Sequence, residues 1–248
     1  MKSIIIFLLV VCVSNVSAAS LGAFRIYLDE DNRHKKFPIR NSSNTPEVCE
    51  IKFNNRRYDG IGGVKKLTVE EQEQLSKAPL DRLKYSPKTF MIDPNSTRYI
   101  SFSYRRVPND NSNELRTYAV FSCRKQQSSV EGQGVFSALL DLAVPVVIRT
   151  GDSKDYSVDL SLEVDKRTSE KFTVNLIHNG TRSIYGDVYL VNEDGERLLK
   201  LKKSAVLYSD MKQLNLSIPA EYSSHKGIAI EFEETGPYQL KQTFKLTI

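Results

Sequence analysis

The chain has 248 residues, and its 35 Lys and Arg against 30 Asp and Glu give a formal net charge of +5. Both signs of charge are mixed along the chain, so it lacks the dense basic stripe of a nucleic-acid-binding protein. The mild positive excess suits an exported protein whose partners are acidic or carry carboxylates. The length is long for one domain and comfortable for two.

The first 18 residues have the pattern of a secretory signal peptide. Lys2 gives a positive start, Ile4 to Val13 form a short apolar core, and small residues at 16–18 offer a cleavage site. We therefore expect a mature chain that begins near Ala19 or Ser20 and acts outside the cytoplasm. The apolar core is too short for a membrane anchor, and no later segment predicts membrane insertion. A buried N-terminal helix is the alternative.

The cysteines predict one disulfide. Cys12 lies in the signal peptide, which leaves Cys49 and Cys123 in the mature chain, both in strand-like sequence. An even pair in an oxidising compartment favours a bridge, and two buried free thiols are the alternative. A zinc site is not expected from two isolated cysteines without a nearby histidine.

Short strand-like segments recur through the first half, separated by Gly, Asn, Pro and Ser. They span residues 23–28, 36–40, 47–53, 98–107 and 115–123. This pattern favours a β-sandwich over an α/β fold. One segment, residues 67–78, predicts a surface helix, because Thr68 and Glu71 have the spacing of a capping box and Pro79 follows its expected end.

An apolar run at residues 135–149 stands out, with the sequence VFSALLDLAVPVVIR. It is too hydrophobic for a half-solvated strand, and it is shorter and more interrupted than the ~20 apolar residues of a spanning helix. Such a run needs a cover, either the protein's own core or a partner. In a strand its alternate residues share one face; these are Phe136, Ala138, Leu140 and Leu142.

The second half repeats the strand pattern after the apolar run stops at residues 150–153. Strand-like segments span residues 155–164, 171–180, 183–191, 212–219, 227–236 and 242–248. We therefore predict an all-β protein of two sandwiches, with domains at 19–150 and 151–248. A short linker between them implies a fixed angle and a cleft.

Nothing in the sequence predicts an enzyme. His34, His178 and His225 are isolated among polar residues, and each is expected on the surface. No nucleophile elbow, phosphate-binding glycine loop or metal-spaced cluster is present. We expect neither a catalytic site nor a cofactor or metal ion.

In several motifs the chain resembles the periplasmic pilus-assembly chaperones of the PapD type. The segment LKYSPKTFMIDPNSTRYISFSYRR is similar to the signature of their first domain, and NELRTYAVF resembles the strand that follows. AVPVVIR lies where their last strand of domain one ends. VNLIHNGTRSIYGDVYLV and FEETG resemble a hairpin and an acidic turn of domain two. The resemblance covers nearly the whole mature chain and implies two immunoglobulin-like domains.

The resemblance also implies a function. Such a chaperone binds and caps pilus (fimbrial) subunits in the periplasm by donor-strand complementation, and delivers them to an outer-membrane usher without a cofactor. The donor residues would be Phe136, Ala138, Leu140 and Leu142. The alternative is that this face closes the protein's own core.

Further site residues are implied by position. Arg25 aligns with the family's cleft arginine, which binds the subunit's C-terminal carboxylate; an ordinary solvated arginine is the alternative. The cleft lysine of well-known members falls at Pro145, which departs from the pattern. Glu114, Arg149 and Glu234 resemble an interdomain ion network whose third member is usually Asp.

Two other functions remain open on the sequence. One is an extracellular adhesion or structural protein of two immunoglobulin-like domains, for which the Asn-x-Ser/Thr sequons at Asn41, Asn95, Asn179 and Asn215 would matter. The other is a secreted hydrolase, which the missing histidine-centred constellation disfavours.

Overall fold

A computed structural model describes residues 19–60, 63–107, 113–125, 140–152, 156–167, 171–224, 227–236 and 238–246. The expected signal peptide lies outside these residues, as do Phe136, Ala138 and His225. Within the described residues, no helix combines the length and the apolar character that crossing a membrane requires.

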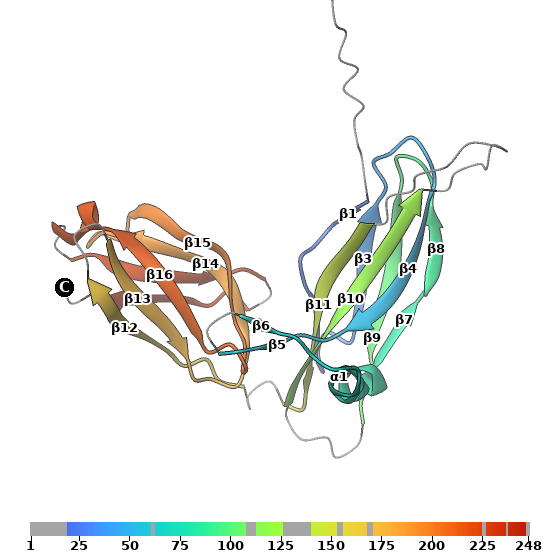
Figure 1. Ribbon diagram of the computed structural model, residues 1–248, viewed down its shortest axis with the longest axis horizontal. Coiled ribbons are helices and arrows are strands. Elements are labelled where there is room, and N and C mark those ends of the chain that lie inside the picture. The colour runs from blue at the N-terminus through green and yellow to red at the C-terminus, as the bar shows by residue number, and fades with distance from the viewer. Residues whose placement is uncertain are drawn as a thin grey trace, which may run out of the picture.

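The protein is all-β, and its strands form two β-sandwiches set at an angle (Figure 1). The strands of the first sandwich come from residues 20–150 and those of the second from residues 160–245. The prediction of two sandwich domains is confirmed.

The first sandwich consists of two sheets. One sheet has the order β1 (Ser20–Leu21), β3 (His34–Arg40), β9 (Thr97–Tyr104), β7 (Leu83–Ser86). The other has the order β2 (Ile26–Leu28), β11 (Leu140–Thr150), β10 (Asn113–Lys125), β4 (Glu47–Asn54), β8 (Thr89–Ile92). Their inner faces share one hydrophobic core, in which Phe37, Phe102 and Phe121 are fully buried.

The second sandwich also has two sheets. The smaller sheet has the order β12 (Leu160–Arg167), β13 (Lys171–His178), β16 (Gln213–Pro219). The larger has the order β15 (Arg197–Leu207), β14 (Ile184–Val191), β17 (Ala229–Glu234), β18 (Lys241–Lys245). A 3-10 turn, η2 (Ala220–Ser224), follows β16.

Period-two alternation of apolar and polar residues explains why these segments form half-buried strands. In β16 the side chains of Leu214, Leu216 and Ile218 are buried, and the residues between them are exposed. Strand β11 is different, because both its faces are covered near its end. Val146 and Ile148 pack in the core of the first domain, and Arg149 is buried on the opposite face.

The single helix in the described part of the chain, α1 (Val69–Arg82), begins as predicted and ends later than predicted. Thr68 is the N-cap, and the reciprocal hydrogen bonds of a capping box join it to Glu71. Pro79 lies inside the helix and is buried there. Proline disfavours a helix interior by about 3 kcal/mol, so the packing of Pro79 overrides its local preference.

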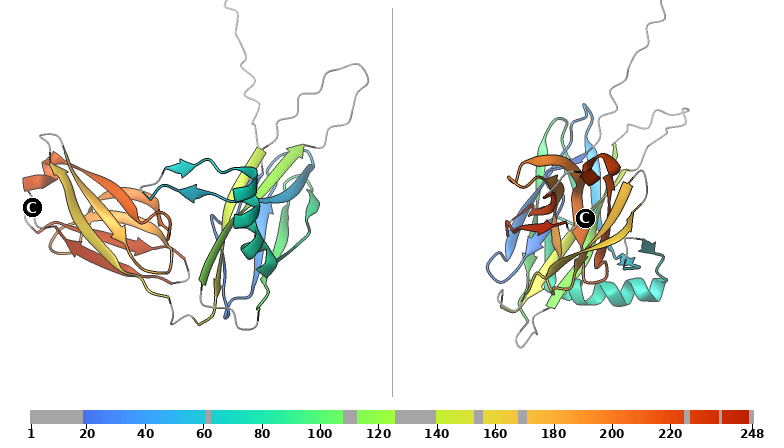
Figure 2. Two further views of the ribbon diagram at one scale, coloured as in Figure 1. Left: turned by 60° about the horizontal axis from the view of Figure 1, so that its bottom comes forward. Right: turned by 90° about the vertical axis from the view of Figure 1, so that its left-hand side faces the viewer.

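Before α1, the chain forms a two-stranded hairpin of β5 (Arg57–Tyr58) and β6 (Val64–Lys65). This hairpin leaves the first sandwich and reaches the second (Figure 2). Its Gly60 carbonyl accepts a hydrogen bond of 3.2 Å from the Gln213 backbone N–H of β16.

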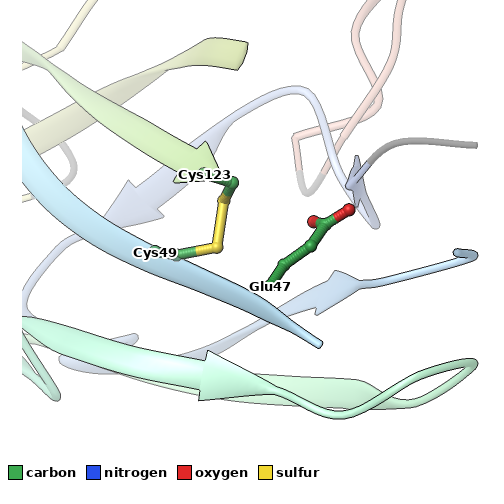
Figure 3. Close-up of side chains that lie close together, drawn as sticks. All are labelled: Glu47, Cys49 and Cys123. Atoms are coloured by element: carbon green, nitrogen blue, oxygen red, sulfur yellow. A yellow bond between two sulfur atoms is a disulfide. The ribbon is translucent and has the colours of Figure 1, made fainter. Parts of the chain in front are cut away.

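The predicted disulfide is present between Cys49 of β4 and Cys123 of β10 (Figure 3). The two cysteines lie directly opposite each other in the antiparallel ladder, with Cα atoms 4.1 Å apart. The alternative of two free thiols is therefore wrong. Glu47 lies close to both sulfur atoms, but the sulfurs are bonded to each other and leave no thiolate for a metal ion.

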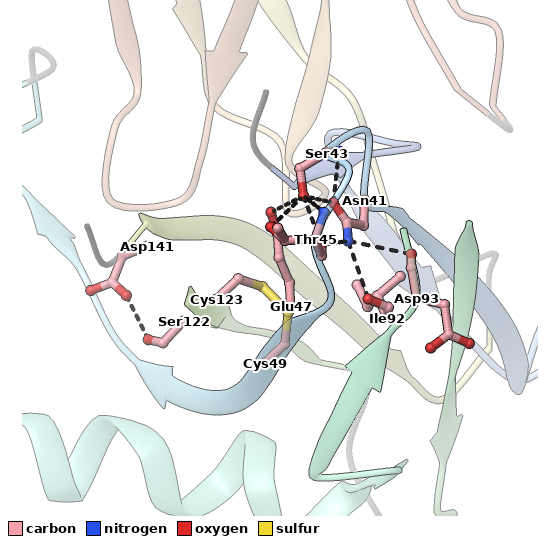
Figure 4. Close-up of a disulfide and its surroundings, with 10 residues drawn as sticks. All are labelled: Asn41, Ser43, Thr45, Glu47, Cys49, Ile92, Asp93, Ser122, Cys123 and Asp141. Carbon is pink, nitrogen blue, oxygen red and sulfur yellow. Dashed lines mark hydrogen bonds between the residues drawn. A yellow bond between two sulfur atoms is a disulfide. The ribbon is translucent and has the colours of Figure 1, made fainter. Parts of the chain in front are cut away.

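One expectation about a polar residue is corrected, and one sequon residue is found to be buried. His178 was expected on the surface, but it is buried, with 1% of its surface exposed, at the end of β13 after Leu176 and Ile177. Its Nε2 lies 2.6 Å from the Arg182 carbonyl oxygen and fastens the loop after β13. The sequon residue Asn41 is fully buried, and its side-chain amide donates to backbone carbonyls (Figure 4), so it cannot carry a glycan.

Candidate functional site

The first half of β11 has one free edge. On one side β11 pairs with β10 along its whole length, from Leu140 opposite Cys123 to Thr150 opposite Asn113. On the other side it pairs in parallel with β2, and only at residues 146–148. Among the described residues, none pairs with residues 140–145 on this side. Unpaired N–H and C=O groups at such an edge can accept a further strand.

The face of β11 that carries the expected donor residues continues into the protein's own core. Leu142 is half-buried and packs against that core, and Val144, Val146 and Ile148 are buried in it. Leu140 is placed in the strand, but its side chain lies outside the described residues. The face is therefore continuous and apolar from Leu142 to Ile148.

A cleft of about 700 Å³ separates the two domains, and Arg25 lies in its wall. Arg25 directly precedes β2. Its Nη1 donates a hydrogen bond of 2.7 Å to the Tyr208 hydroxyl of the second domain, and its guanidinium lies 4.1 Å from the Tyr185 ring centroid. The Nε atom is buried and has no hydrogen-bond partner.

Other charged and aromatic side chains complete the wall of this cleft. Two lysines, Lys35 and Lys203, and two aspartates, Asp29 and Asp187, line it together with Arg25. Phe24 lines it too and is 77% exposed. Pro145, the position of the family's lysine, is paired with Tyr118 inside the sheet. Positive charge in the cleft comes from elements other than β11.

Burial also sets the ionisation of a tyrosine in the cleft. Desolvation raises the pKa of Tyr27 to about 12, against the opposing effect of the nearby Arg25 and Arg149 cations. The Tyr27 hydroxyl therefore stays neutral across the physiological range. It does not offset the positive charge of Arg25 and Arg149.

The expected interdomain network is arranged as two ion pairs. Arg149 Nε donates to Glu114 Oε2 at 2.8 Å, within the first domain. Glu234 pairs with Arg182 of its own domain, at 2.6 and 3.0 Å. No hydrogen bond or ion pair between described residues joins Glu234 to Arg149. Instead, the guanidiniums of Arg149 and Arg182 lie 4.3 and 4.5 Å from the centroid of the Tyr238 ring.

A second interdomain cluster had no signal in the sequence. Asp210, in the turn between β15 and β16, accepts two hydrogen bonds of 2.9 Å from Arg116 Nη2 and one of 3.1 Å from the Tyr58 backbone N–H. Arg116 is separated from Asp210 by 94 positions in the sequence. No local pattern connects a turn aspartate with an arginine of another domain.

Three solved structures with a similar fold contain chaperones. The crystal structure of the Pseudomonas aeruginosa CupB2 chaperone matches with a TM-score of 0.52 at 14% identity, covering 91% of this chain and 98% of that chain. The structure of the Salmonella enterica SafA pilin in complex with the SafB chaperone matches with a TM-score of 0.56 at 10% identity, covering 95% and 98%.

A third match covers similar shares of both chains. The crystal structure of the E. coli chaperone DraB has a TM-score of 0.51 at 11% identity and covers 94% of this chain and 98% of that chain. No family model and no curated protein sequence matches this chain. At these identities the matches establish the fold: it is the two-domain β-sandwich fold of the pilus chaperones, along nearly the whole chain.

Proposed function

We propose that this protein is a periplasmic chaperone that binds and caps pilus subunits by donor-strand complementation and delivers them to an outer-membrane usher. The observation that carries the proposal is the free edge of β11 at residues 140–145, beside an apolar face, in a chain with the pilus-chaperone fold. Chaperone–pilin complexes are an established example of strand addition.

In this proposal, a subunit whose sandwich lacks a strand pairs with the free edge of β11. The subunit's backbone groups bond to the unpaired N–H and C=O groups, and alternate donor side chains fill its open groove. The proposed donors are Phe136, Ala138 and Leu140, followed by Leu142, which can offer only the part of its side chain that the protein's own core leaves uncovered. Burial of about four such side chains, at ~25 cal/mol per Å² of apolar area, contributes several kcal/mol.

Arg25 is the proposed anchor for the subunit's C-terminal carboxylate. A guanidinium forms short, charge-assisted hydrogen bonds with a carboxylate. Arg25 lies in the interdomain cleft, where no described residue accepts a hydrogen bond from its Nη2, and Lys35 and Lys203 line the same cleft. Either lysine is a candidate for the role that Pro145 cannot fill.

The remaining steps require binding rather than chemistry. The proposed chaperone is not an enzyme and uses no cofactor, because the subunit's final and tighter strand exchange drives its release. Cleavage of the signal peptide at residues 1–18 places the mature chain in the periplasm. The domains at 19–150 and 151–248 then serve as donor-strand domain and second wall of the cleft.

Co-expression with candidate pilus subunits in a bacterial periplasm tests this function. We expect a soluble one-to-one complex with the wild-type protein. Leu140→Glu should abolish it, because an ionised carboxylate in an apolar groove has no partner. The matched control is Val164→Glu in β12, where the side chain is already 55% exposed. Capture of subunits by Leu140→Glu at the wild-type level would disprove donor-strand binding by this segment.

A further inference from the structure

One turn of the second domain contacts the cleft arginine. The turn connects β15 and β16 and spans residues 208–211. It is closed by two backbone hydrogen bonds of 3.0 Å, one in each direction, between Tyr208 and Met211. Tyr208 is buried, with 2% of its surface exposed. The backbone closure and burial leave its hydroxyl little freedom to move.

The Tyr208 hydroxyl holds one end of the Arg25 guanidinium. It accepts the 2.7 Å hydrogen bond from Arg25 Nη1, while the Tyr185 ring lies against the guanidinium at 4.1 Å. No described residue accepts a hydrogen bond from Arg25 Nε or Nη2. Nε is buried, so Nη2 is the group that a ligand can reach, and it suits a charge-assisted hydrogen bond to a carboxylate.

The first domain in turn holds Tyr208 in place. The Arg116 guanidinium lies 3.8 Å from the Tyr208 ring centroid, and the Tyr58 ring stacks on it with centroids 5.6 Å apart. Asp210, two residues further along the turn, binds both Arg116 and the Tyr58 backbone. The hairpin β5–β6 therefore fixes the turn, and the turn fixes Arg25.

We propose that Tyr208 is a positioning residue, which holds Arg25 in the orientation that binds a carboxylate; this rests on the proposed function. A long arginine side chain loses rotamer freedom when it binds a ligand, and a side chain already held in place loses less. Tyr208 also occupies Nη1, and Nε is buried, which leaves Nη2 for the ligand. The specificity for a chain-terminal carboxylate thus depends on a residue of the second domain.

The test compares two small probes, N-acetylphenylalanine and N-acetylphenylalanine amide, which differ only in the carboxylate. Binding to the full mature protein is followed by NMR titration, with the Arg25 Nε–H signal as the local reporter and Arg25→Lys to assign it. The test variant is Tyr208→Phe, which removes the hydroxyl and keeps the ring. The control is Tyr238→Phe, which removes a different interdomain hydroxyl bond, of 3.0 Å to Asp29.

For the wild type we expect the acid to bind about tenfold more tightly than the amide and to shift the Arg25 signal. Tyr208→Phe should reduce this preference to about threefold or less, and Tyr238→Phe should keep it. An unchanged preference in Tyr208→Phe overturns the positioning role and leaves the carboxylate site intact. An equal loss in both variants also overturns it, since any loosening of the domains would then suffice. A wild type without any preference overturns both the positioning role and the proposed carboxylate site.

Discussion

Glu114 of β10 lies directly opposite Arg149 of β11, and its Oε2 accepts a hydrogen bond of 2.8 Å from Arg149 Nε. One residue of the second domain forms hydrogen bonds with both members of this pair. The Ser183 backbone N–H donates to the Glu114 carboxylate at 3.1 and 3.2 Å, and its carbonyl accepts from Arg149 Nη2 at 3.1 Å. The Glu114–Arg149 ion pair therefore satisfies both the N–H and the C=O group of Ser183, the residue directly before β14.

Arg149→Ala should loosen the angle between the domains. The substitution leaves the nearly buried Glu114 carboxylate without its cation, and breaking a buried pair in this way costs about 3 kcal/mol. Spin labels at Lys84→Cys and Glu163→Cys, one in each domain, should give a broader distance distribution, and urea should unfold the variant earlier. Arg98→Ala, at an exposed position of β9, is the matched control. An unchanged distance distribution in Arg149→Ala would refute the orienting role.

Loss of the disulfide should destabilise the first domain. The bridge closes a loop of 74 positions between adjacent strands, and removal of a native disulfide typically costs about 2–5 kcal/mol. Dithiothreitol should lower the denaturation midpoint of the wild type. The Cys49→Ala, Cys123→Ala double variant should start at this lower midpoint and should not respond to dithiothreitol. Equal midpoints for the wild type with and without reductant would contradict the prediction.

Local pattern was sufficient to predict many of the strands, but no predicted segment covers β15. Strand β16 alternates apolar and polar residues, and that alternation alone identifies its buried face. The start of α1 after Thr68 could also be predicted from local sequence, because a capping box involves two residues that are three positions apart. The end of α1 could not be predicted, because the burial of Pro79 depends on a sheet formed by distant segments.

Side-chain contacts, both within the second domain and between the domains, were the part of the site that the sequence could not supply. His178 was expected on the surface, yet the turn after β13 folds its ring against the Arg182 carbonyl. The pairing of Glu234 with Arg182 also escaped prediction, since an arginine before a strand carries no signal of its own. Resemblance placed Arg25 in the cleft, but its link to Tyr208 depends on how the two domains meet.

Glu47→Gln should stabilise the protein at neutral pH. Burial raises the pKa of the Glu47 carboxyl above its ordinary value of 4.5, and Oε2 has no hydrogen-bond partner. The folded state therefore holds the proton more tightly than the unfolded state. Its stability falls as the pH rises from 4.5 through the raised pKa.

The Glu47→Gln variant does not lose stability as the pH rises, because an amide does not ionise. We expect its free energy of unfolding to exceed that of the wild type by about 1 kcal/mol at pH 7. The difference should vanish below pH 4.5, where the wild-type carboxyl is protonated in both states. Thermal melts from pH 4 to 8 measure this, with exposed Glu50→Gln on the same strand as control. A constant difference at all pH values would show that titration of Glu47 is not the cause.

Asp210→Ala should detach the hairpin β5–β6 from the second domain. The substitution removes the acceptor for both Arg116 and the Tyr58 backbone, and Arg116 is left nearly buried without its carboxylate. Asp210 is 29% exposed, so water offsets part of the loss, and we expect about 1–2 kcal/mol.

Hydrogen exchange distinguishes this local effect from general destabilisation. In the Asp210→Ala variant, the backbone amides of Tyr58 and Gln213 should lose protection, because the first donates to Asp210 and the second to Gly60 of the hairpin. Amides in the core strand β14 should keep their protection. Asp194→Ala, in an exposed loop of the same domain, should alter none of these rates. Equal loss of protection in β14 would mean that Asp210 stabilises the whole second sandwich. It would contradict a specific role of Asp210 in attaching the hairpin β5–β6.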